Sequence, residues 1–362
     1  MRIFLIEPYY TGSHQAWADG WQTISGHEIH LLTMEGRFWK WRMHGGPVTL
    51  AHQAIDLATE VGLPEVVVAS SMLDLATFHG LAGRQLGNPP SLLYMHENQL
   101  TYPLSPRTRG EDLSYGFVNW RSMLAADQVV FNSHYHRDAF FEAIAPFLKN
   151  FPDYRQTDLV DQVLDKTSVI GVGIPIRPAR QSDQESPLVL WNQRWEYDKN
   201  PIEMFEILYR LADQGVAFQL AVTGENFRQV PTEFAEAEER LRDRVVQFGF
   251  AEQDRYDELV ARADIVLSCA QHEFFGVSVA EAVAAGAFPV LPNRLSYPEL
   301  IPSQAHDATL YETPDQAVDL LAKALTDTDL RKEVTRITRR AMEQFSWGVI
   351  GPRYDELVAG LR

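Results

Sequence analysis

Short apolar runs alternate with longer segments of helical spacing along almost the whole chain, and this alternation most limits what the chain can fold into. Six runs in the first half are typical of strands: 3–6, 28–32, 66–69, 92–95, 128–132 and 168–172. Five more follow in the second half: 188–191, 217–222, 245–248, 265–268 and 288–291. Strands that alternate with helices predict mostly parallel sheets with helices on both faces. We therefore predict an α/β fold built twice.

The length of the chain favours two domains, because 362 residues exceed what one hydrophobic core usually organises. The proline-bearing stretch 175–178 and the polar run 181–187 form the best linker candidate. We predict a Rossmann-like N-terminal domain over 1–175 and a Rossmann-like C-terminal domain over 186–340, facing each other across a cleft. A helical segment over 341–362 is expected to cross back and pack on the N-terminal domain.

The composition limits the compartment and the partners of the protein. Hydrophobic residues make up 45% of the chain and charged residues 22%, which is usual for a folded soluble protein. No segment has the apolar length of a membrane span, and the only cysteine, Cys269, excludes an intrachain disulfide and a cysteine-rich zinc site. The net charge of −17 argues against a generally basic surface for nucleic acid or membrane, although a local basic patch is compatible with it. We expect a cytoplasmic protein without a membrane partner.

Two glutamates in the second half, Glu273 and Glu281, flank the expected start of a helix near Gly276 and Val277. A helix start presents backbone N–H groups and positive dipole character, so it suits a phosphate-bearing ligand. The two carboxylates could then contact different parts of that ligand. Taken alone, the pair is better explained as a loop acid and a surface helix acid, and only the neighbouring sequence favours a ligand site.

Three further strand ends in the second half carry residues suited to a nucleotide. Arg194 and Lys199 follow the first strand, before a helix that Pro201 would start. Two cations there can clamp a diphosphate, although cations are common on surface loops. Gly224 ends the next strand, where backbone can approach a ligand closely, and Phe250 follows the third, where an aromatic ring could meet a base.

In the first half, Tyr10, Gly12, Ser13 and His14 follow the first strand. Glycine and hydroxyl groups at a strand-to-helix turn could meet phosphate or sugar, although the three-glycine dinucleotide motif is absent. A simple turn with Ser13 as the helix cap explains the residues equally well.

Hydrogen-bonding residues follow the strand at 92–95, namely His96, Glu97, Asn98 and Gln99. Such a run suits a sugar or polyol, and His96 could handle a proton or a hydroxyl group. The alternative is a satisfied, partly buried histidine. His134 and His136 are expected on a helix surface. We predict no metal site, because we find no sufficiently tight cluster of histidines and acids.

Aromatic and basic residues interleave at Arg37, Trp39, Lys40, Trp41 and Arg42. This pattern can stack bases and meet phosphates. The same alternation is typical of a half-buried strand, so the segment leaves both interpretations open.

The strand-end residues of the second half resemble the donor site of retaining GT-B glycosyltransferases of the large family 4 class. The resemblance rests on Arg194, Lys199, Glu273, Glu281 and the intervening Phe275-Gly276. It implies that the two cations hold the donor diphosphate, that Glu273 lies beside the transferred sugar and that Glu281 binds the ribose. It also implies that the backbone over 275–277 supports phosphate and sugar.

A closer resemblance, to the tRNA-queuosine mannosyltransferase family, covers nearly the whole chain. The matching segments are 7–14, 39–42, 70–72, 94–100, 131–133 and 194–201. The resemblance implies transfer of mannose from GDP-mannose to the cyclopentenediol of queuosine in the anticodon of aspartate tRNA, with retained configuration.

We therefore expect a retaining glycosyltransferase that needs neither cofactor nor metal. The expected catalytic residues are His96, Arg194, Lys199 and Glu273. The expected donor-binding residues are Gly224, Phe250, Phe275, Gly276, Val277 and Glu281. The expected acceptor-binding residues are Tyr10, Gly12, Ser13, His14, Trp39, Trp41, Arg42, Glu97 and Asn98. Two alternatives stay open: a glycosyltransferase with another nucleotide-sugar and a lipid, glycan or small-metabolite acceptor, and a non-catalytic nucleotide-sugar-binding protein.

Overall fold

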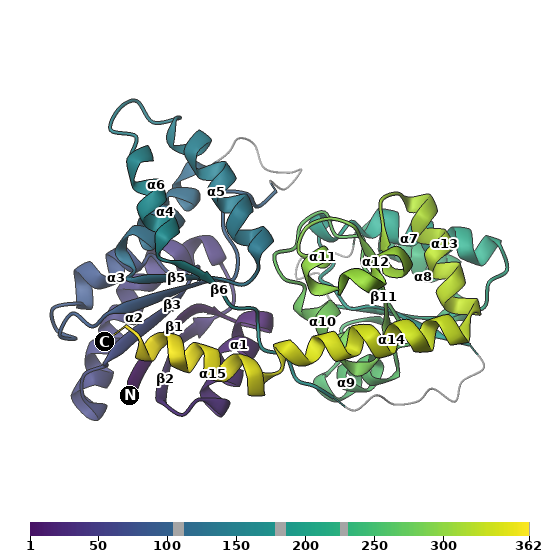
Figure 1. The fold of residues 1–362 in the computed structure, drawn as a ribbon, viewed down its shortest axis with the longest axis horizontal. Coiled ribbons are helices and arrows are strands. Elements are labelled where there is room, and N and C mark those ends of the chain that lie inside the picture. The colour runs from purple at the N-terminus through teal and green to yellow at the C-terminus, as the bar shows by residue number, and fades with distance from the viewer. Residues whose placement is uncertain (104–111, 178–185, 225–230, 362) are drawn as a thin grey trace. The chain divides into compact units, whose positions relative to one another are not determined.

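A computed structural model describes residues 1–103, 112–177, 186–224 and 231–361 of the chain (Figure 1). The chain divides into two compact units. Unit 1 comprises Met1–Gly173 and Trp347–Arg362, and unit 2 comprises Ile174–Ser346. Most of the predicted linker lies outside the described residues, because 178–185 are not among them.

Unit 1 is built on a six-stranded parallel sheet of order β2-β1-β3-β4-β5-β6. Its strands are β1 (Arg2–Tyr10), β2 (Glu28–Glu35), β3 (Val66–Ser70), β4 (Ser91–Met95), β5 (Gln128–Phe131) and β6 (Thr167–Val169). Each of the six strands predicted in the first half corresponds to one of them. The sheet order places the carboxyl ends of β1 and β4 two positions apart, with β3 between them.

Helices cover both faces of this sheet, as the buried strands require. Phe4 and Ile6 of β1 join one core with side chains of α2, α3, α4 and α5, while Ile3 and Leu5, which alternate with them, are equally buried. On that other side Trp17 of α1 stacks on Tyr94 of β4, with ring centroids 4.7 Å apart. The helices of this unit are α1 (Gly12–Ile24), α2 (Trp39–Val61), α3 (Leu75–Ala82), α4 (Leu113–Ala125), α5 (His134–Leu148) and α6 (Val160–Asp165).

The C-terminal helix α15 (Trp347–Ala359) packs on unit 1, beside α1 (Figure 1). Its Asp355 accepts hydrogen bonds from the Trp21 indole (2.8 Å), the Ser25 hydroxyl (2.6 Å) and the Gly26 backbone N–H (2.8 Å). The prediction that the C-terminal helix packs back on the N-terminal domain is confirmed.

Replacing Asp355 by alanine is expected to lower the free energy of unfolding by about 3 kcal/mol, because three hydrogen bonds to one carboxylate are lost together. The N–H group of the buried Trp21 indole would also lose its hydrogen-bond acceptor. Urea unfolding followed by tryptophan fluorescence measures the change. Glu356→Ala, at the exposed neighbouring position of the same helix, is the matched control. Equal stability of the two variants would contradict this account of the helix docking.

Unit 2 contains a second six-stranded parallel sheet, of order β12-β11-β10-β7-β8-β9. Its strands are β7 (Leu188–Trp191), β8 (Gln219–Thr223), β9 (Val245–Gly249), β10 (Ile265–Leu267), β11 (Phe288–Pro292) and β12 (Leu310–Tyr311). The sequence did not predict β12, because two residues at a sheet edge are too short for a periodic signal. The α/β prediction is confirmed for both halves.

The helices of unit 2 follow its strands in the alternation that the sequence predicted. Those longer than four residues are α7 (Pro201–Asp213), α8 (Thr232–Arg240), α9 (Gln253–Arg262), α10 (Val277–Ala285), α13 (Pro314–Thr326) and α14 (Thr328–Met342). Two short helices, α11 (Tyr297–Leu300) and α12 (His306–Thr309), complete the unit. Within the described ranges, none of the helices combines the length and the apolar character that crossing a membrane requires.

Candidate functional site

The Lys199 ammonium group is the centre of the polar cluster beyond the β7 end of unit 2. Its Nζ donates to the His272 carbonyl oxygen (2.8 Å) and to Glu273 Oε2 (3.2 Å), and it lies 3.1 Å from Asp198 Oδ2. Burial opposes a charged ammonium, but Glu273 and Asp198 outweigh it and raise the pKa of Lys199 above its ordinary value. Lys199 therefore carries a fixed positive charge at this strand end.

The Glu273 carboxylate is held in its charged form by the same cluster. Burial alone would raise its pKa, yet the Lys199 ammonium holds the pKa of Glu273 below its usual value. Its Oε1 also accepts the backbone N–H of Phe274 (3.1 Å). The neighbouring His272 is neutral at physiological pH, because burial and the positive charge of Lys199 lower its pKa to about 4. The structure thus brings the predicted residues Lys199 and Glu273 together as an ion pair.

Asp198 is a member of this cluster that sequence reasoning missed. Its side chain is buried against Lys199, and its backbone carbonyl accepts the N–H groups of Gln271 (2.8 Å) and His272 (3.2 Å). The residue therefore joins the loop that carries Lys199 to the loop that carries Glu273. Its position next to Lys199 in the sequence was the only available signal.

The start of α10 lies directly after the Glu273 loop and requires a glycine. Gly276 has a φ of 90°, in the left-handed region, and an added Cβ would lie 3.2 Å from a ring carbon of Tyr297. The helix then begins at Val277. The Phe275 side chain is buried in edge-to-face contact with Phe345, with centroids 5.2 Å apart. A ligand at this helix start would therefore meet the backbone of Phe275 and not its side chain, in line with the backbone contact that the family resemblance implies.

Glu281, one and a half turns into α10, occupies a different environment from Glu273. Its Oε2 accepts the Tyr256 hydroxyl at 3.2 Å. Burial raises the pKa of Glu281 to about 7, partly opposed by Arg177 and by the Tyr256 hydrogen bond. Asn192 in turn donates to the Tyr256 hydroxyl (3.1 Å) and to the Ser278 carbonyl (2.8 Å). Sequence reasoning missed Tyr256 and Asn192, which belong to other segments of the chain.

Three other predicted donor residues also follow strands of unit 2. Gly224, after β8, has a φ of 103°, and an added Cβ would lie 2.3 Å from the Gln193 carbonyl oxygen. Phe250, after β9, leaves 58% of its surface exposed and is therefore accessible to a ligand. Arg194, after β7, is exposed as well. These residues come from the same edge of the sheet as Lys199, because parallel strands share their carboxyl ends.

In unit 1, the loop after β1 leads straight into α1, which begins at Gly12. Thr11 occupies the N-cap position, so the alternative in which Ser13 caps the helix is wrong. Gly12 has a φ of 50° with no atom within 4 Å of an added Cβ, and Ser13 is exposed. The Tyr10 hydroxyl bonds to Asp19, and burial together with this carboxylate raises the pKa of Tyr10 to about 12.

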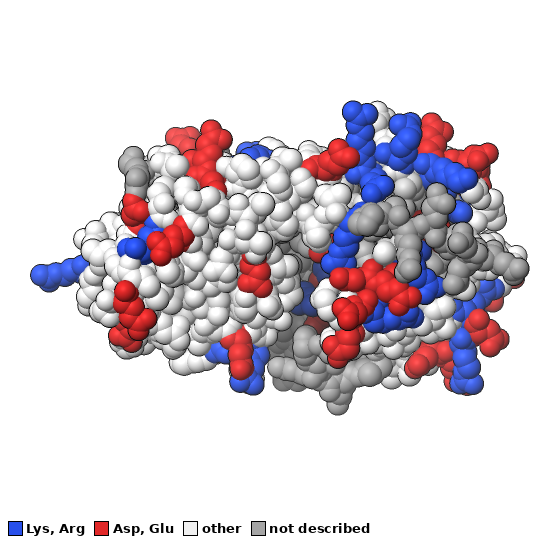
Figure 2. Space-filling model, turned by 90° about the horizontal axis from the view of Figure 1, so that it is seen from below, with Lys and Arg blue, Asp and Glu red and all other residues white. Residues whose placement is uncertain are grey.

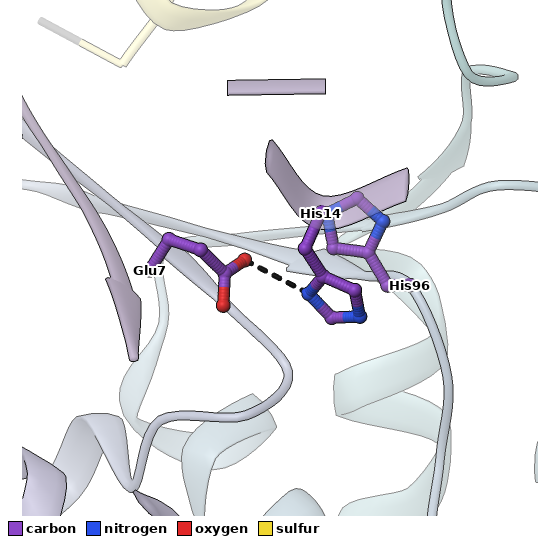
Figure 3. Close-up of side chains that lie close together, drawn as sticks. All are labelled: Glu7, His14 and His96. Carbon is purple, nitrogen blue, oxygen red and sulfur yellow. Dashed lines mark hydrogen bonds and ion pairs between the residues drawn. The ribbon is translucent and has the colours of Figure 1, made fainter. Parts of the chain in front are cut away.

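His14 and His96 lie against each other beside the carboxylate of Glu7 (Figure 3). Their ring centroids are 4.2 Å apart, and His14 Nδ1 lies 3.0 Å from Glu7 Oε2. One nitrogen of each ring and one Glu7 oxygen all lie within 4.8 Å of one another, a spacing that could hold a metal ion. This cluster was not predicted from the sequence, because residues 7, 14 and 96 meet only through the arrangement of strands in the sheet.

His96 is held in place by the loop after β5. Its carbonyl oxygen accepts the Asn132 amide (2.9 Å), and Asn132 Oδ1 bonds to His136 Nδ1 (2.8 Å). His136 is fully buried, so its predicted place on a helix surface is wrong, whereas His134 is exposed as predicted. Burial, followed by the neighbouring imidazoles of His14 and His136, holds the pKa of His96 well below its ordinary value. His96 is therefore neutral at physiological pH.

The loop after His96 is stabilised mainly by its own polar side chains. Asn98 is fully buried, and its Oδ1 accepts from the backbone N–H groups of Leu100 (3.0 Å) and Thr101 (2.9 Å). Its enclosed side chain fits a loop-stabilising role better than the predicted acceptor contact. Glu97 is only partly buried, and its Oε1 accepts the Gln99 amide (2.7 Å).

α2 begins at Trp39, within the aromatic and basic run at 37–42, so the alternative that this run forms a half-buried strand is wrong. Trp41 leaves 63% of its surface exposed, while Trp39 packs against Tyr115 with centroids 5.0 Å apart. Lys40 Nζ lies 5.5 Å from the centroid of the Trp39 ring. Arg42 is buried, and its guanidinium donates to the Glu35 carbonyl (3.1 Å). This arrangement does not favour the predicted contact of Arg42 with the acceptor substrate.

The two halves of the chain match two protein-family models. Residues 2–174 match the N-terminal region of tRNA-queuosine alpha-mannosyltransferase, and residues 174–341 match glycosyl transferases group 1. Among solved structures, a glycosyltransferase from Rickettsia africae ESF-5 superposes with a TM-score of 0.71 at 16% identity, covering 99% of this chain and 98% of its own. Sucrose-phosphate synthase from Thermosynechococcus elongatus reaches 0.73 at 16% identity, with 100% and 99% covered. These likenesses show the GT-B fold.

Two curated relatives carry the comparison further. GDP-mannose:cellobiosyl-diphosphopolyprenol alpha-mannosyltransferase from Xanthomonas campestris is 21% identical, over 82% of this chain and 77% of its own length. The tRNA-queuosine alpha-mannosyltransferase of Drosophila melanogaster is 34% identical, over 86% of this chain and 83% of its own. With that identity over most of both sequences, the chain belongs to the tRNA-queuosine alpha-mannosyltransferase family and is a glycosyltransferase.

Proposed function

We propose that this enzyme transfers mannose from GDP-mannose to queuosine in the anticodon of tRNA(Asp), with retention of configuration. The main observation in support of this acceptor substrate is the family match over residues 2–174. This is the half in which we place the acceptor. The 34% identity to a tRNA-queuosine alpha-mannosyltransferase supports the same acceptor.

The residues of unit 2 support a nucleotide-sugar as the donor. Lys199, with its fixed charge, and the exposed Arg194 supply positive charge for a leaving diphosphate, and the start of α10 adds backbone N–H groups. This preorganised positive charge is the role that a metal ion would otherwise serve, so the proposal needs no cofactor. The charged Glu273 would accept hydrogen bonds from sugar hydroxyls, and Glu281 would accept those of the ribose.

Transfer with retention requires the acceptor hydroxyl to approach the face from which the diphosphate leaves. In the proposed reaction the sugar–phosphate bond breaks as the bond to the acceptor oxygen forms. The departing phosphate oxygen takes the acceptor proton, so no protein residue has to keep it. Lys199 and Arg194 would stabilise the negative charge that develops on the diphosphate, which is where electrostatic catalysis has its largest effect.

A tRNA acceptor is compatible with the charge distribution, although the chain carries a net charge of −17. On the face drawn in Figure 2, basic and acidic side chains are intermingled, and a large part of the visible surface carries neither. Local basic groups can therefore meet phosphates. At the start of α2, the exposed Trp41 and the adjacent Lys40 supply a stacking surface and a cation for an RNA loop. We propose a cytoplasmic location, where tRNA is available.

The direct test incubates the purified enzyme with GDP-mannose and queuosine-containing tRNA, digests the RNA and weighs the nucleosides. The expected result is the mass of one added hexose on queuosine, unchanged when EDTA is present. tRNA(Asp) without queuosine is the matched control acceptor and should gain nothing. Transfer from another nucleotide-sugar in place of GDP-mannose would refute the donor.

The same assay separates the two alternatives from this proposal. A glycosyltransferase with another acceptor would leave the tRNA unmodified and would glycosylate a lipid, glycan or small polyol instead. A non-catalytic binding protein would bind the nucleotide-sugar, measured by calorimetry, without releasing nucleoside diphosphate. Either outcome would refute the queuosine acceptor while leaving the fold and the family membership intact.

A further inference from the structure

Glu7, to which the sequence analysis assigned no role, lies buried beside the two histidines of unit 1 (Figure 3). The residue lies on β1 and is 0% exposed, so it cannot contact a substrate itself. Its Oε1 accepts the Tyr9 backbone N–H (2.8 Å), and its Oε2 lies 3.0 Å from His14 Nδ1. Both oxygens are therefore engaged within the protein, and His14 is the side chain through which Glu7 can act on a ligand.

The contact with Glu7 fixes how His14 is presented. A carboxylate accepts and never donates when ionised, so it places the Nδ1 proton of His14 on the side of Glu7. The ring orientation and the protonation of Nδ1 are thereby set. The Nε2 edge of the ring is then the part that meets groups on the side away from Glu7.

His96 supplies a second imidazole at the same place. Its ring lies 4.2 Å from that of His14, centroid to centroid, with an angle of 37° between the planes. Its Nε2 is buried and makes no hydrogen bond within the described part of the chain. A buried polar atom without a partner is costly, so a ligand group that bonds to it gains affinity. His14 and His96 keep 7% and 8% of their surface exposed, so the pair lies at the edge of the accessible surface.

We propose that His14 and His96 together bind one substrate hydroxyl group, and that Glu7 is the positioning residue that orients His14 for it. A hydroxyl group donates one hydrogen bond and accepts others, so it can bond to a ring nitrogen of His14 and to one of His96 at once. The step is binding alone, and no proton leaves the substrate. The inference rests on the proposed function, because a polyol substrate of this enzyme supplies the hydroxyl. Both the acceptor diol and the donor sugar carry such a group.

A metal ion is the competing occupant, because two histidines and a glutamate are also a zinc-binding set. The hydrogen bonds of the cluster favour the hydroxyl group. Glu7 Oε2 and His14 Nδ1 lie 3.0 Å apart and are hydrogen-bonded to each other, so the lone pairs that a metal between them would need are already engaged. The other Glu7 oxygen is held by the Tyr9 N–H at 2.8 Å. Binding a metal would break this arrangement, whereas binding a hydroxyl group keeps it.

The positioning role is tested by histidine nitrogen NMR on the ¹⁵N-labelled full chain. Wild type should show His14 protonated at Nδ1, and Glu7→Gln should show a mixture of tautomers, because an amide can both donate and accept. Glu28→Gln is the matched control. Glu28 lies 2.9 Å from His30 Nε2 in an equally short but solvent-exposed pair. A His14 pattern unchanged in Glu7→Gln would overturn the positioning role.

The hydroxyl site is tested by steady-state kinetics on Glu7→Gln and His14→Phe, the second of which keeps an aromatic ring against His96. Each variant is expected to raise the KM of one substrate by about tenfold, because one hydrogen bond to that substrate is lost. The KM of the other substrate should stay unchanged. A raised acceptor KM would assign the hydroxyl to the tRNA, and a raised donor KM to the sugar. If both KM values stay at wild type in both variants, the site is refuted. Should Glu7→Gln not fold, His14→Phe decides alone.

Two further measurements separate this inference from the proposed function. Adding GDP-mannose or queuosine-containing tRNA to the labelled wild type should shift the His14 and His96 signals, whether or not sugar is transferred. Binding with these shifts but without transfer would refute the proposed function and support the hydroxyl site. Stoichiometric zinc in purified wild type that is absent from His14→Phe would overturn the hydroxyl site in favour of a metal.

Discussion

Lys199→Met is expected to reduce kcat for transfer by about two to three orders of magnitude, the effect of removing one preorganised charge from a developing anion. In the proposed reaction the ammonium stabilises the leaving diphosphate, and this charge grows as the sugar–phosphate bond breaks. The donor KM should rise less than kcat falls, because the interaction strengthens in the transition state. Discontinuous detection of released nucleoside diphosphate measures both constants.

The same substitution should also destabilise the fold, by about 3–5 kcal/mol, because it leaves a buried charge without its partner. Asp198 and Glu273 would face each other without the cation that lies 3.1 and 3.2 Å from them. Protonation would relieve this repulsion, so the stability deficit should shrink in acid. Lys332→Met, at an exposed position of α14, is the control for loss of a lysine. Wild-type turnover in a folded Lys199→Met enzyme would remove Lys199 from the mechanism.

The two α/β units could be predicted from the sequence, because strands and helices have different periodicities of apolar residues and both periodicities recur along this chain. β7 matches its predicted range, Leu188–Trp191. α7 begins at Pro201, as predicted, because the first turn of a helix tolerates proline. The start of α2 was ambiguous, because Trp39 and Trp41 alternate with cations as in a strand. Tertiary packing decides it: Met43, Leu50 and Ala54 continue the segment with helical spacing and are buried.

The residues of the candidate site could be predicted only where they belong to short motifs of neighbouring residues in the sequence. Lys199 and Glu273 were predicted from strand ends and from the family resemblance, and the structure pairs them at 3.2 Å. The partners that set their chemistry come from distant segments. Tyr256 reaches Glu281 from α9, and Glu7 reaches His14 from inside β1. A sequence shows that such residues exist, but the contact itself depends on the packing of elements.

Glu281→Gln is the second substitution with a large expected effect. It should raise the stability of the fold at alkaline pH and should lower the activity. Burial raises the pKa of Glu281 to about 7 in the folded protein, against an ordinary value of 4.5. The folded state therefore binds this proton more tightly than the unfolded state. The corresponding stability is present in acid and is lost as the pH rises through about 7. A neutral amide avoids this loss, so the variant should be more stable than wild type in alkaline solution.

Urea unfolding should show Glu281→Gln gaining about 1–3 kcal/mol over wild type at alkaline pH and little near pH 5, since each pKa unit corresponds to about 1.4 kcal/mol. Glu258→Gln is the matched control on α9. Glu258 pairs with Arg255 (2.8 Å) and Arg262 (3.1 Å), and hydrogen bonds from these arginines lower its pKa. Its neutralisation should therefore remove stability at alkaline pH. A gain of stability in both variants would point to relief of the net negative charge instead.

The activity of Glu281→Gln should fall although its fold gains stability. In the proposed site the carboxylate accepts hydrogen bonds from the ribose, and charged acceptors bind more strongly than amides. The donor KM of the variant should rise about tenfold or more and should lose its pH dependence, because the titrating group is gone. In wild type the donor KM should fall as the pH rises through about 7, when Glu281 becomes charged. A donor KM that follows the same pH curve in both proteins would show that another group binds the ribose. The buried, poorly solvated carboxylate would then be a cost to stability that donor binding does not explain.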